Sequence, residues 1–194
     1  MRRFDERSAA ARLAAKTDYG TPREVYASLD AQFSFTVDLA AHARNHKHPR
    51  FFSPEQDSLR QSWAGETGFL NPPFGDGVGV WLGKARHEAI RERAIVVQLL
   101  PARVGTRWWR QYVEGEDEPA GRLRSSSWVP STRVLWLRWD GLITGIHYLR
   151  ERLTFDGADD PAKFDCAVVT HASPNRAPPP AAKDPASICW GWPR

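Results

Sequence analysis

Four consecutive residues, Asn71-Pro72-Pro73-Phe74, combine the groups that could hold a planar amine. Proline fixes φ at about −65° and cannot donate to a β-ladder, so the apolar strand before them must end here. The resulting turn should present the side-chain oxygen of Asn71 and the main-chain oxygen of Pro72, with Phe74 as a flat apolar face. The exocyclic amino group of a base donates two hydrogens beside a ring that stacks, and it matches this set. Asn-Pro and Pro-Pro also form ordinary turns, so a purely structural turn stays open.

The segment before the first expected strand carries the residues of a helix start. Thr21 can cap, Pro22 suits the first helical position, and Glu24 completes a capping box. Val25 and Leu29 then fall on one face of the helix. Capping alone would nearly account for Thr21.

Two acidic residues follow expected strands. Residues 33–37 are predicted to form the first strand, and Asp38 ends it, at the place where α/β folds bind ligands. Asp38 could accept from an ammonium group, or it could only cap the next turn. Asp57 follows a short predicted strand at 50–53, and it too could be a helix cap.

The remaining pattern alternates helices and strands. Residues 80–93 have helical spacing, and 94–103 form a continuous apolar run typical of a buried parallel strand. Thr106 can cap a short helix. Further strands are expected within 132–139, 144–149 and 165–171. The order predicts an α/β sheet with helices on its faces.

Composition indicates one globular domain. The chain has 194 residues, of which 41% are hydrophobic and 26% charged. We expect an N-terminal arm or helix at 1–17, a domain at 18–173 with a mobile polar loop at 114–127, and a tail at 174–194 that holds six prolines. Without an apolar run long enough for a bilayer or a signal peptide, a cytoplasmic protein with no membrane association is expected.

Metal and disulfide chemistry are disfavoured. Cys166 and Cys189 form no C-x-x-C pair, and a reducing compartment argues against a disulfide between them. His42, His46 and His48 lack an evident further ligand of fixed geometry, so a polar loop is favoured and no metal is predicted.

Taken in order, six stretches resemble the phage-type, Dam-like family of DNA N6-adenine methyltransferases. The resemblance covers about residues 18 to 171. The stretches are Thr21-Pro22, "FTVDLAA" through Asp38, "FFSPEQDSL" through Asp57, "NPPFG", "VVQLLPARVGTRWW" and "LRERLTFDGADDPAKFDCAVVTH".

The resemblance implies a Rossmann-like class I methyltransferase with a mostly parallel central sheet, helices on both faces, and S-adenosyl-L-methionine as cofactor. It implies the catalytic motif Asn71, Pro72, Pro73 and Phe74. Cofactor contacts would come from Thr21, Pro22, Asp38, Ala40, Asp57 and Asn71. The side of the target base would be formed by Arg103, Arg152 and Phe155. Thr21 and Asp38 would lie at the methionine end, and Asp57 at the adenosine.

Three features depart from the family pattern. Its fourth catalytic position is commonly Tyr, and Phe74 keeps the stack but loses a hydroxyl. No Gly-rich turn follows the first strand, so the residues alone support the cofactor weakly. The segment 114–132 is longer than the family needs, and it is either a target-recognition loop or an insertion.

The implied reaction is methyl transfer to N6 of an adenine flipped out of double-stranded DNA. Two acceptors would bind both amino hydrogens and favour a nitrogen tilted toward sp³, with the donor methyl in line at about 3 Å. The proton leaves after transfer, so no strong general base is needed. The net charge of +4 is compatible with DNA, and Arg122 and Arg124 are expected to contact its backbone. A monomer is compatible with the sequence.

Other functions stay open. A carbon-5 cytosine enzyme normally uses a cysteine preceded by proline, but Cys166 follows Asp165 and Cys189 follows Ile188. N4 of cytosine fits the same motif. A glutamine methyltransferase usually carries a Gly-rich first turn, which is lacking. A catalytically inactive DNA- or cofactor-binding module is the alternative from another class.

Overall fold

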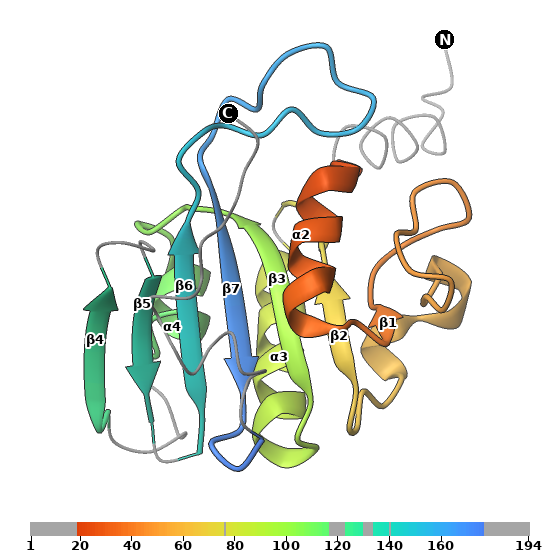
Figure 1. Ribbon diagram of the computed structural model, residues 1–194. Helices are drawn as coiled ribbons and strands as arrows, with labels where there is room; N and C mark the ends of the chain where they lie inside the picture. The colour runs from red at the N-terminus through yellow and green to blue at the C-terminus, as the bar shows by residue number, and fades with distance from the viewer. Residues whose placement is uncertain (1–18, 76, 117–122, 130–133, 140, 177–194) are drawn as a thin grey trace, which may run out of the picture.

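The computed structural model describes residues 19–75, 77–116, 123–129, 134–139 and 141–176. Its strands form one sheet in the order β1-β2-β3-β7-β6-β5-β4 (Figure 1). They are β1 (Val37–Asp38), β2 (Thr67–Leu70), β3 (Ile95–Pro101), β4 (Ser125–Val129), β5 (Val134–Arg138), β6 (Ile143–Tyr148) and β7 (Cys166–Ala172). The helices are α2 (Arg23–Phe33), α3 (Val78–Arg91) and α4 (Arg107–Tyr112), with 3-10 turns η1 (Pro54–Gln56) and η2 (Ser58–Arg60). None of the helices in this described part is long and apolar enough to cross a bilayer.

One part of the sheet is parallel and consists of β1, β2 and β3. Helix α3 makes the crossover from β2 to β3. Gly68 on β2 allows a close approach, because a Cβ there would lie 2.4 Å from the Cδ1 atom of Leu39. The carboxyl ends of the three strands share one edge of the sheet, where β1 ends in Asp38 and β2 leads into Asn71.

The other part is antiparallel, so the prediction of a mostly parallel sheet is wrong. β3 pairs antiparallel with β7, and the pairs β7–β6, β6–β5 and β5–β4 are antiparallel as well. A parallel connection needs a crossover of roughly a dozen residues or more, and only residues 139–142 separate β5 from β6. The apolar pattern of these strands indicates burial, and it carries no information on their direction.

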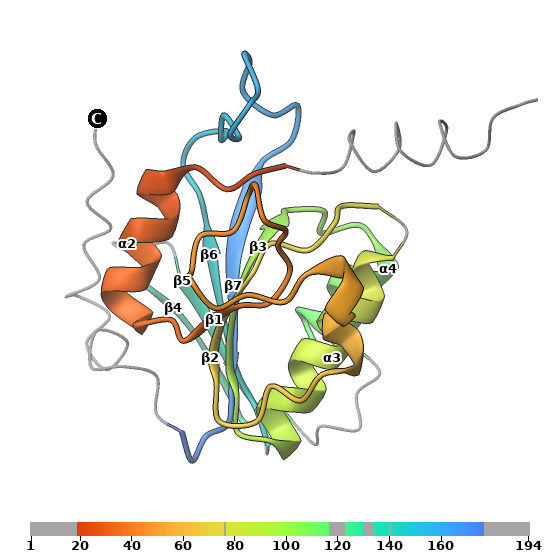
Figure 2. The ribbon, with the colours of Figure 1, turned by 90° about the vertical axis from the view of Figure 1, so that its right-hand side faces the viewer.

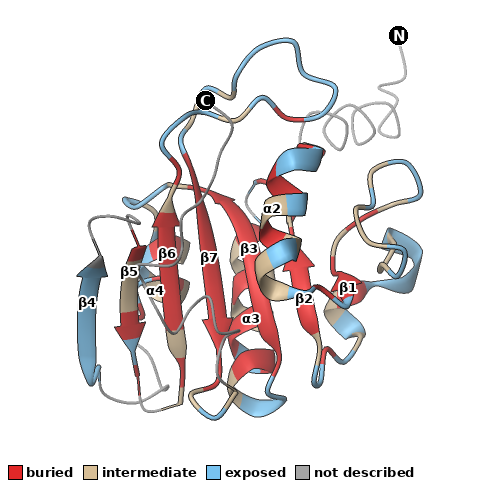
Figure 3. Cartoon of the chain, viewed as in Figure 1, coloured by how far each residue is buried: buried red, intermediate tan, exposed pale blue. Residues whose placement is uncertain are grey.

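Helices cover both faces of the sheet, as predicted. In Figure 2, α2 lies on one side of the sheet, and α3 and α4 lie on the other. The side chains of β3 alternate between two cores: Val97 and Leu99 pack with the α2 side, and Leu100 with the α3 and α4 side. Strands β3 and β7 are buried along their whole length, whereas residues 125–128 of β4, at the sheet edge, are exposed (Figure 3).

Several local predictions are confirmed and others are wrong. The predicted helices correspond to α2, α3 and α4, and the three late strands to β5, β6 and β7. The residue at the N-cap of α2 is Pro22, and no side chain of the described residues caps this helix, so the predicted capping box at Thr21 is wrong. Residues 33–37 contribute only Val37 to β1. Part of the predicted loop 114–127 belongs to β4. The predicted arm and most of the predicted tail lie outside the described residues.

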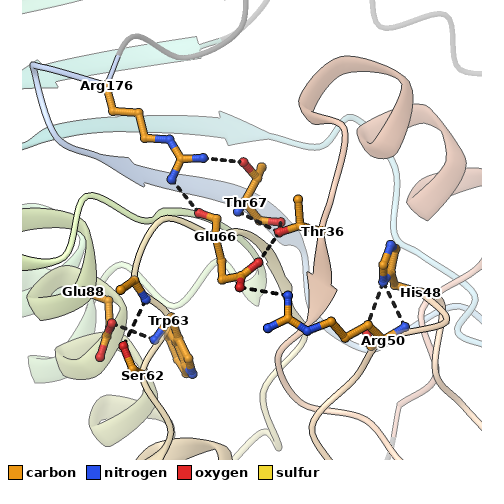
Figure 4. Close-up of polar contacts among 10 residues, drawn as sticks. Thr36, His48, Arg50, Ser62, Trp63, Glu66, Thr67, Glu88 and Arg176 are labelled. Atoms are coloured by element: carbon orange, nitrogen blue, oxygen red, sulfur yellow. Dashed lines mark hydrogen bonds and ion pairs between the residues drawn. The ribbon is translucent and has the colours of Figure 1, made fainter.

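Polar contacts fasten the amino end of β2 (Figure 4). The Glu66 carboxylate accepts a hydrogen bond from the Thr36 hydroxyl at 2.6 Å and pairs with Arg50 at 2.8 Å. Arg176, which follows β7, donates to the main-chain oxygen of Glu66 at 2.9 Å and to the Thr67 hydroxyl at 3.1 Å. These contacts join four separate segments at the end of β2 opposite Asn71.

Candidate active site

A cavity of about 420 Å³ lies at the carboxyl ends of β1 and β2. The connection between these two strands forms much of its wall, and the Asn71-Pro72-Pro73 turn forms another part. Three aromatic side chains line it, together with several polar groups; these residues include Tyr19, Phe52, Trp81, Asn45, Ser53, Asp57 and Ser58. The volume lies within the range of small-molecule sites, about 300–1,000 Å³.

The Asn71 side chain is held in one orientation. Its Nδ2 donates to the main-chain oxygen of Tyr19 at 2.6 Å and contacts the Thr21 hydroxyl oxygen at 3.0 Å. A carbonyl oxygen only accepts, so the nitrogen must face Tyr19 and the amide oxygen must point elsewhere. That oxygen, Oδ1, is buried and has no hydrogen-bond partner among the described residues. A buried acceptor left without a donor is costly, so Oδ1 is suited to a donor supplied by a ligand.

The rest of the motif has two different environments. Pro72 and Pro73 line the cavity beside Asn71. Phe74 does not: its side chain is only 7% exposed and belongs to the core on the α2 side. Its ring centroid lies 5.6 Å from that of Tyr19 and 6.0 Å from that of Phe155. The predicted flat face of Phe74 is therefore covered by other aromatic rings in this structure.

Asp38 supports the cavity wall from behind. It is buried, and its carboxylate accepts main-chain hydrogen bonds from Lys47 at 3.0 Å and Ala40 at 3.4 Å. Burial raises the pKa of Asp38, while the hydrogen bonds from Lys47 and Ala40 oppose this shift. Ala40 itself lines the cavity, whereas Asp38 does not. The structure thus gives Asp38 the turn-fixing contacts that the sequence left open as an alternative.

Asp57 reaches the cavity directly. The residue has a left-handed backbone, with φ of 48°, between the two 3-10 turns η1 and η2. Its side chain is 49% exposed and pairs with Arg60 at 3.1 Å. A half-exposed carboxylate at the rim can accept hydrogen bonds from hydroxyl groups of a ligand.

Sequence comparisons with known proteins identify the family of this chain. A sequence model of the family described as "DNA N-6-adenine-methyltransferase (Dam)" matches residues 10–121, more than half of the chain. The chain belongs to the Dam family of DNA N-6-adenine-methyltransferases. It is also 28% identical, over 102 residues, to a protein of Haemophilus phage HP1 named "DNA N-6-adenine-methyltransferase". That match covers 52% of this chain and 58% of the phage protein, so the chain spans little more than half the length of this relative.

The Dam-family match includes the cavity and the Asn71 turn, and it ends before several residues expected near DNA. Thr21 and Pro22 fall within it, and neither lines the cavity; Thr21 is 2% exposed and its hydroxyl faces Asn71. Arg103 also falls within it and is exposed just beyond β3. Arg152 and Phe155 lie beyond the matched residues.

The structure brings the loops of Arg103 and Arg152 together. Arg152 pairs with the Asp165 side chain at 3.3 Å, and the Asp165 main-chain oxygen accepts from Ala102, the neighbour of Arg103, at 2.8 Å. Phe155 is buried and packs on Tyr19, with ring centroids 5.0 Å apart. It therefore reaches the Asn71 region through the aromatic cluster rather than as an exposed ring.

Arg124 is not brought to the cavity. It precedes β4, the edge strand at the opposite side of the sheet from β1, and its main-chain N–H bonds the oxygen of Arg138. Arg122 lies outside the described residues. A contact between these arginines and DNA stays a prediction.

The histidine group takes up three different local arrangements. His42 lines the cavity, His46 stacks on Phe51 with centroids 4.5 Å apart, and the His48 ring is within hydrogen-bond distance of the Arg50 oxygen. Within the described ranges, no three His, Cys, Asp or Glu side chains gather as a metal site would require.

Sequence reasoning missed Tyr19, Phe52 and Trp81, the three aromatic side chains of the cavity. Tyr19 is separated from Asn71 by 52 positions, and the sequence contains no local pattern that links them. The available signal was an aromatic residue two positions before Thr21, inside the Dam-like stretch.

Proposed function

We propose that this protein transfers a methyl group from S-adenosyl-L-methionine to N6 of an adenine flipped out of double-stranded DNA. One observation carries the proposal: Asn71 lies at a Pro-Pro turn beside the cavity, and its buried Oδ1 has no hydrogen-bond partner in the described part of the chain. The Dam-family membership and the name of the phage relative support adenine as the target.

The cavity residues fit the cofactor. Its adenine ring needs apolar walls, which Phe52 and Trp81 can supply, and its ribose hydroxyls need acceptors such as the Asp57 carboxylate. Ala40 and the Asn71 turn would bound the remaining part of the molecule. Asp38 would act by holding the 40–47 loop in place, through its bonds to Ala40 and Lys47.

The chemistry divides between cofactor and protein. When bound, S-adenosyl-L-methionine supplies an electrophilic methyl group on a sulfonium. Asn71 Oδ1 would accept a hydrogen from the adenine amino group and orient its nitrogen toward that methyl. Proximity and orientation of this kind can supply a large part of a rate enhancement. The amino proton is lost after transfer, so a dedicated strong base is not required.

Access to the site requires base flipping, because N6 cannot approach Asn71 while the adenine stays in the duplex. Phe74 would support the flipped base only if the aromatic cluster around it opens a ring face, because in this structure the ring packs in the core beside the turn. Arg103 and Arg152, which lie on neighbouring loops, are proposed contacts on the target side. The parallel strands with their α3 crossover support a Rossmann-like methyltransferase fold within the mixed sheet.

We further propose that residues 18–173 form the methyltransferase domain and that segment 114–132 takes part in target recognition. The phage relative suggests that the reaction takes place in the cytoplasm of a bacterial host.

Incubation of the protein with methyl-labelled cofactor and DNA, followed by mass analysis of the nucleosides, tests the proposal. N6-methyladenine that depends on the protein is the expected product. Detection of N4-methylcytosine instead would show that the target base is cytosine. Normal cofactor binding without any methylated base would support the inactive binding module. Asn71→Ala is the matched control, because it removes the proposed acceptor and leaves both prolines of the turn.

A further inference from the structure

We propose that Thr21 is a positioning residue: with the Tyr19 carbonyl it clamps the Asn71 amide so that Oδ1 stays directed at the adenine amino group. This inference rests on the proposed function. It differs from the role implied by the family resemblance, in which Thr21 touches the cofactor.

The contacts of Thr21 support this role. Its side chain is buried, it does not line the cavity, and its hydroxyl oxygen lies 3.0 Å from Asn71 Nδ2. The hydroxyl makes no capping bond to helix α2, although the sequence suggests one. Nδ2 has two hydrogens, and the Tyr19 oxygen at 2.6 Å and the Thr21 oxygen at 3.0 Å provide one acceptor for each.

The clamp removes the other amide orientation. If the amide turned over, Oδ1 would face the Tyr19 oxygen at the 2.6 Å now spanned by a hydrogen bond, and two acceptors would repel each other. The Thr21 hydroxyl could still donate to a turned amide, so Tyr19 sets the orientation. Thr21 accepts the second hydrogen of Asn71 Nδ2 and so limits rotation of the amide group. Preorganisation of this kind is what makes a polar group effective in a transition state.

The clamping segment is itself fixed. Gly20 forms an isolated antiparallel bridge with Asp156, whose N–H donates to the Gly20 oxygen at 2.8 Å. Lys47, from the loop that walls the cavity, pairs with the Asp156 carboxylate at 2.5 Å. The Tyr19 ring packs on Phe155. The carbonyl that orients Asn71 is therefore held from the 149–165 connection and from the cavity wall.

The proposal predicts different effects for two substitutions of Thr21. Thr21→Val keeps the shape and removes the oxygen, so kcat should fall about tenfold, while cofactor affinity should stay within about twofold. Thr21→Ser restores the oxygen and should recover most of kcat. The matched control is Thr67→Val, which removes another buried threonine hydroxyl at the opposite end of β2; it should leave kcat within about twofold of wild type.

The experiment measures kcat for methyl transfer at saturating DNA and cofactor, cofactor affinity by calorimetry, and hydrogen exchange of the Asn71 side-chain amide by NMR. In the wild-type protein both Nδ2 protons should exchange at least about tenfold more slowly than in a free amide. Thr21→Val should lose part of this protection and Thr21→Ser should keep it. An Asn71 amide that exchanges like a free one in wild type overturns the clamp, whether or not Thr21→Val folds. So does a Thr21→Val protein with normal kcat, or one in which cofactor affinity falls with kcat.

The NMR measurement does not require catalytic turnover, so the clamp can be tested independently of the proposed function. A wild-type protein that methylates no DNA contradicts the proposed function, and the amide exchange still decides whether Thr21 and Tyr19 hold Asn71.

Discussion

The polar groups at the two ends of strand β2 differ in how completely they are hydrogen-bonded. At the amino end, the Glu66 carboxylate has two partners and its main-chain oxygen has another in Arg176. At the carboxyl end, both hydrogens of the Asn71 amide nitrogen bond to the protein, and the buried Oδ1 has no donor among the described residues. Since an unpaired buried acceptor opposes folding, its presence beside a cavity indicates a ligand site. The contacts at the amino end therefore stabilise the fold, whereas the arrangement at the carboxyl end supports the proposed binding role of Asn71.

Substitution of Phe74 measures how much the segment after β2 contributes to the stability of the core. Phe74→Ala would remove a buried ring that packs on Tyr19 and Phe155, and it should lower the free energy of unfolding by about 3–5 kcal/mol. Urea denaturation would measure this loss. A stability change below about 1 kcal/mol would mean that the ring is not core, and that its main role is to stack on the base.

Arg176→Ala should separate stability from activity at the amino end. The guanidinium donates to the main-chain oxygens of Glu66 and Arg93 and to the Thr67 hydroxyl. Its loss should reduce the free energy of unfolding by about 1–3 kcal/mol and leave kcat of the folded protein within about twofold. A kcat that falls with little loss of stability would contradict the division between the two ends.

A buried histidine in the middle of the sheet should make stability depend on pH. Burial, reinforced by Arg86, lowers the pKa of His171 well below its ordinary value, so the folded state keeps this ring neutral. The unfolded chain takes up the proton below about pH 6.5, and stability should therefore fall by up to about 1.4 kcal/mol for each pH unit below that value. Urea midpoints at pH 7.5 and 5.5 check this, and His171→Gln should flatten the difference. If the variant loses the same stability between pH 7.5 and 5.5, other titratable groups cause the pH dependence.

Arg124→Ala should have the smallest effect. Arg124 directly precedes β4, the edge strand at the opposite side of the sheet from β1 and the cavity. Loss of one exposed phosphate contact would reduce the log–log salt slope of DNA binding by about 0.9 at most. Methyl transfer at saturating DNA should stay within about twofold of wild type. A large loss of transfer there would show that β4 approaches the reacting base.

The sequence predicts the elements of this fold better than their arrangement. The apolar run before Pro101 and the helical spacing of residues 80–93 identify β3 and α3, because burial on one or both faces leaves a local periodicity. The direction of β5, β6 and β7 has no such local record, and it depends on connection length and on pairing partners.

The candidate site shows the same division. Asn71 and the two prolines are recognisable because the turn chemistry is local. The Thr-Pro pair predicts a helix cap at Thr21, but the Thr21 hydroxyl instead contacts Asn71, which is 50 positions away. The burial of Phe74 depends on Tyr19, Phe155 and the fold of two other segments, which no four-residue motif can reveal.

Asn71→Ala measured by single-turnover methyl transfer, beside its free energy of unfolding, tests the central claim most directly. The claim is that Oδ1 serves the reaction and not the fold. Removal of one preorganised acceptor should slow transfer roughly a hundredfold or more, while stability changes by less than about 1 kcal/mol, because an unpaired buried oxygen is lost together with the Nδ2 bonds. A variant that transfers methyl groups at nearly the wild-type rate, or whose rate falls only as far as its stability does, would contradict the account.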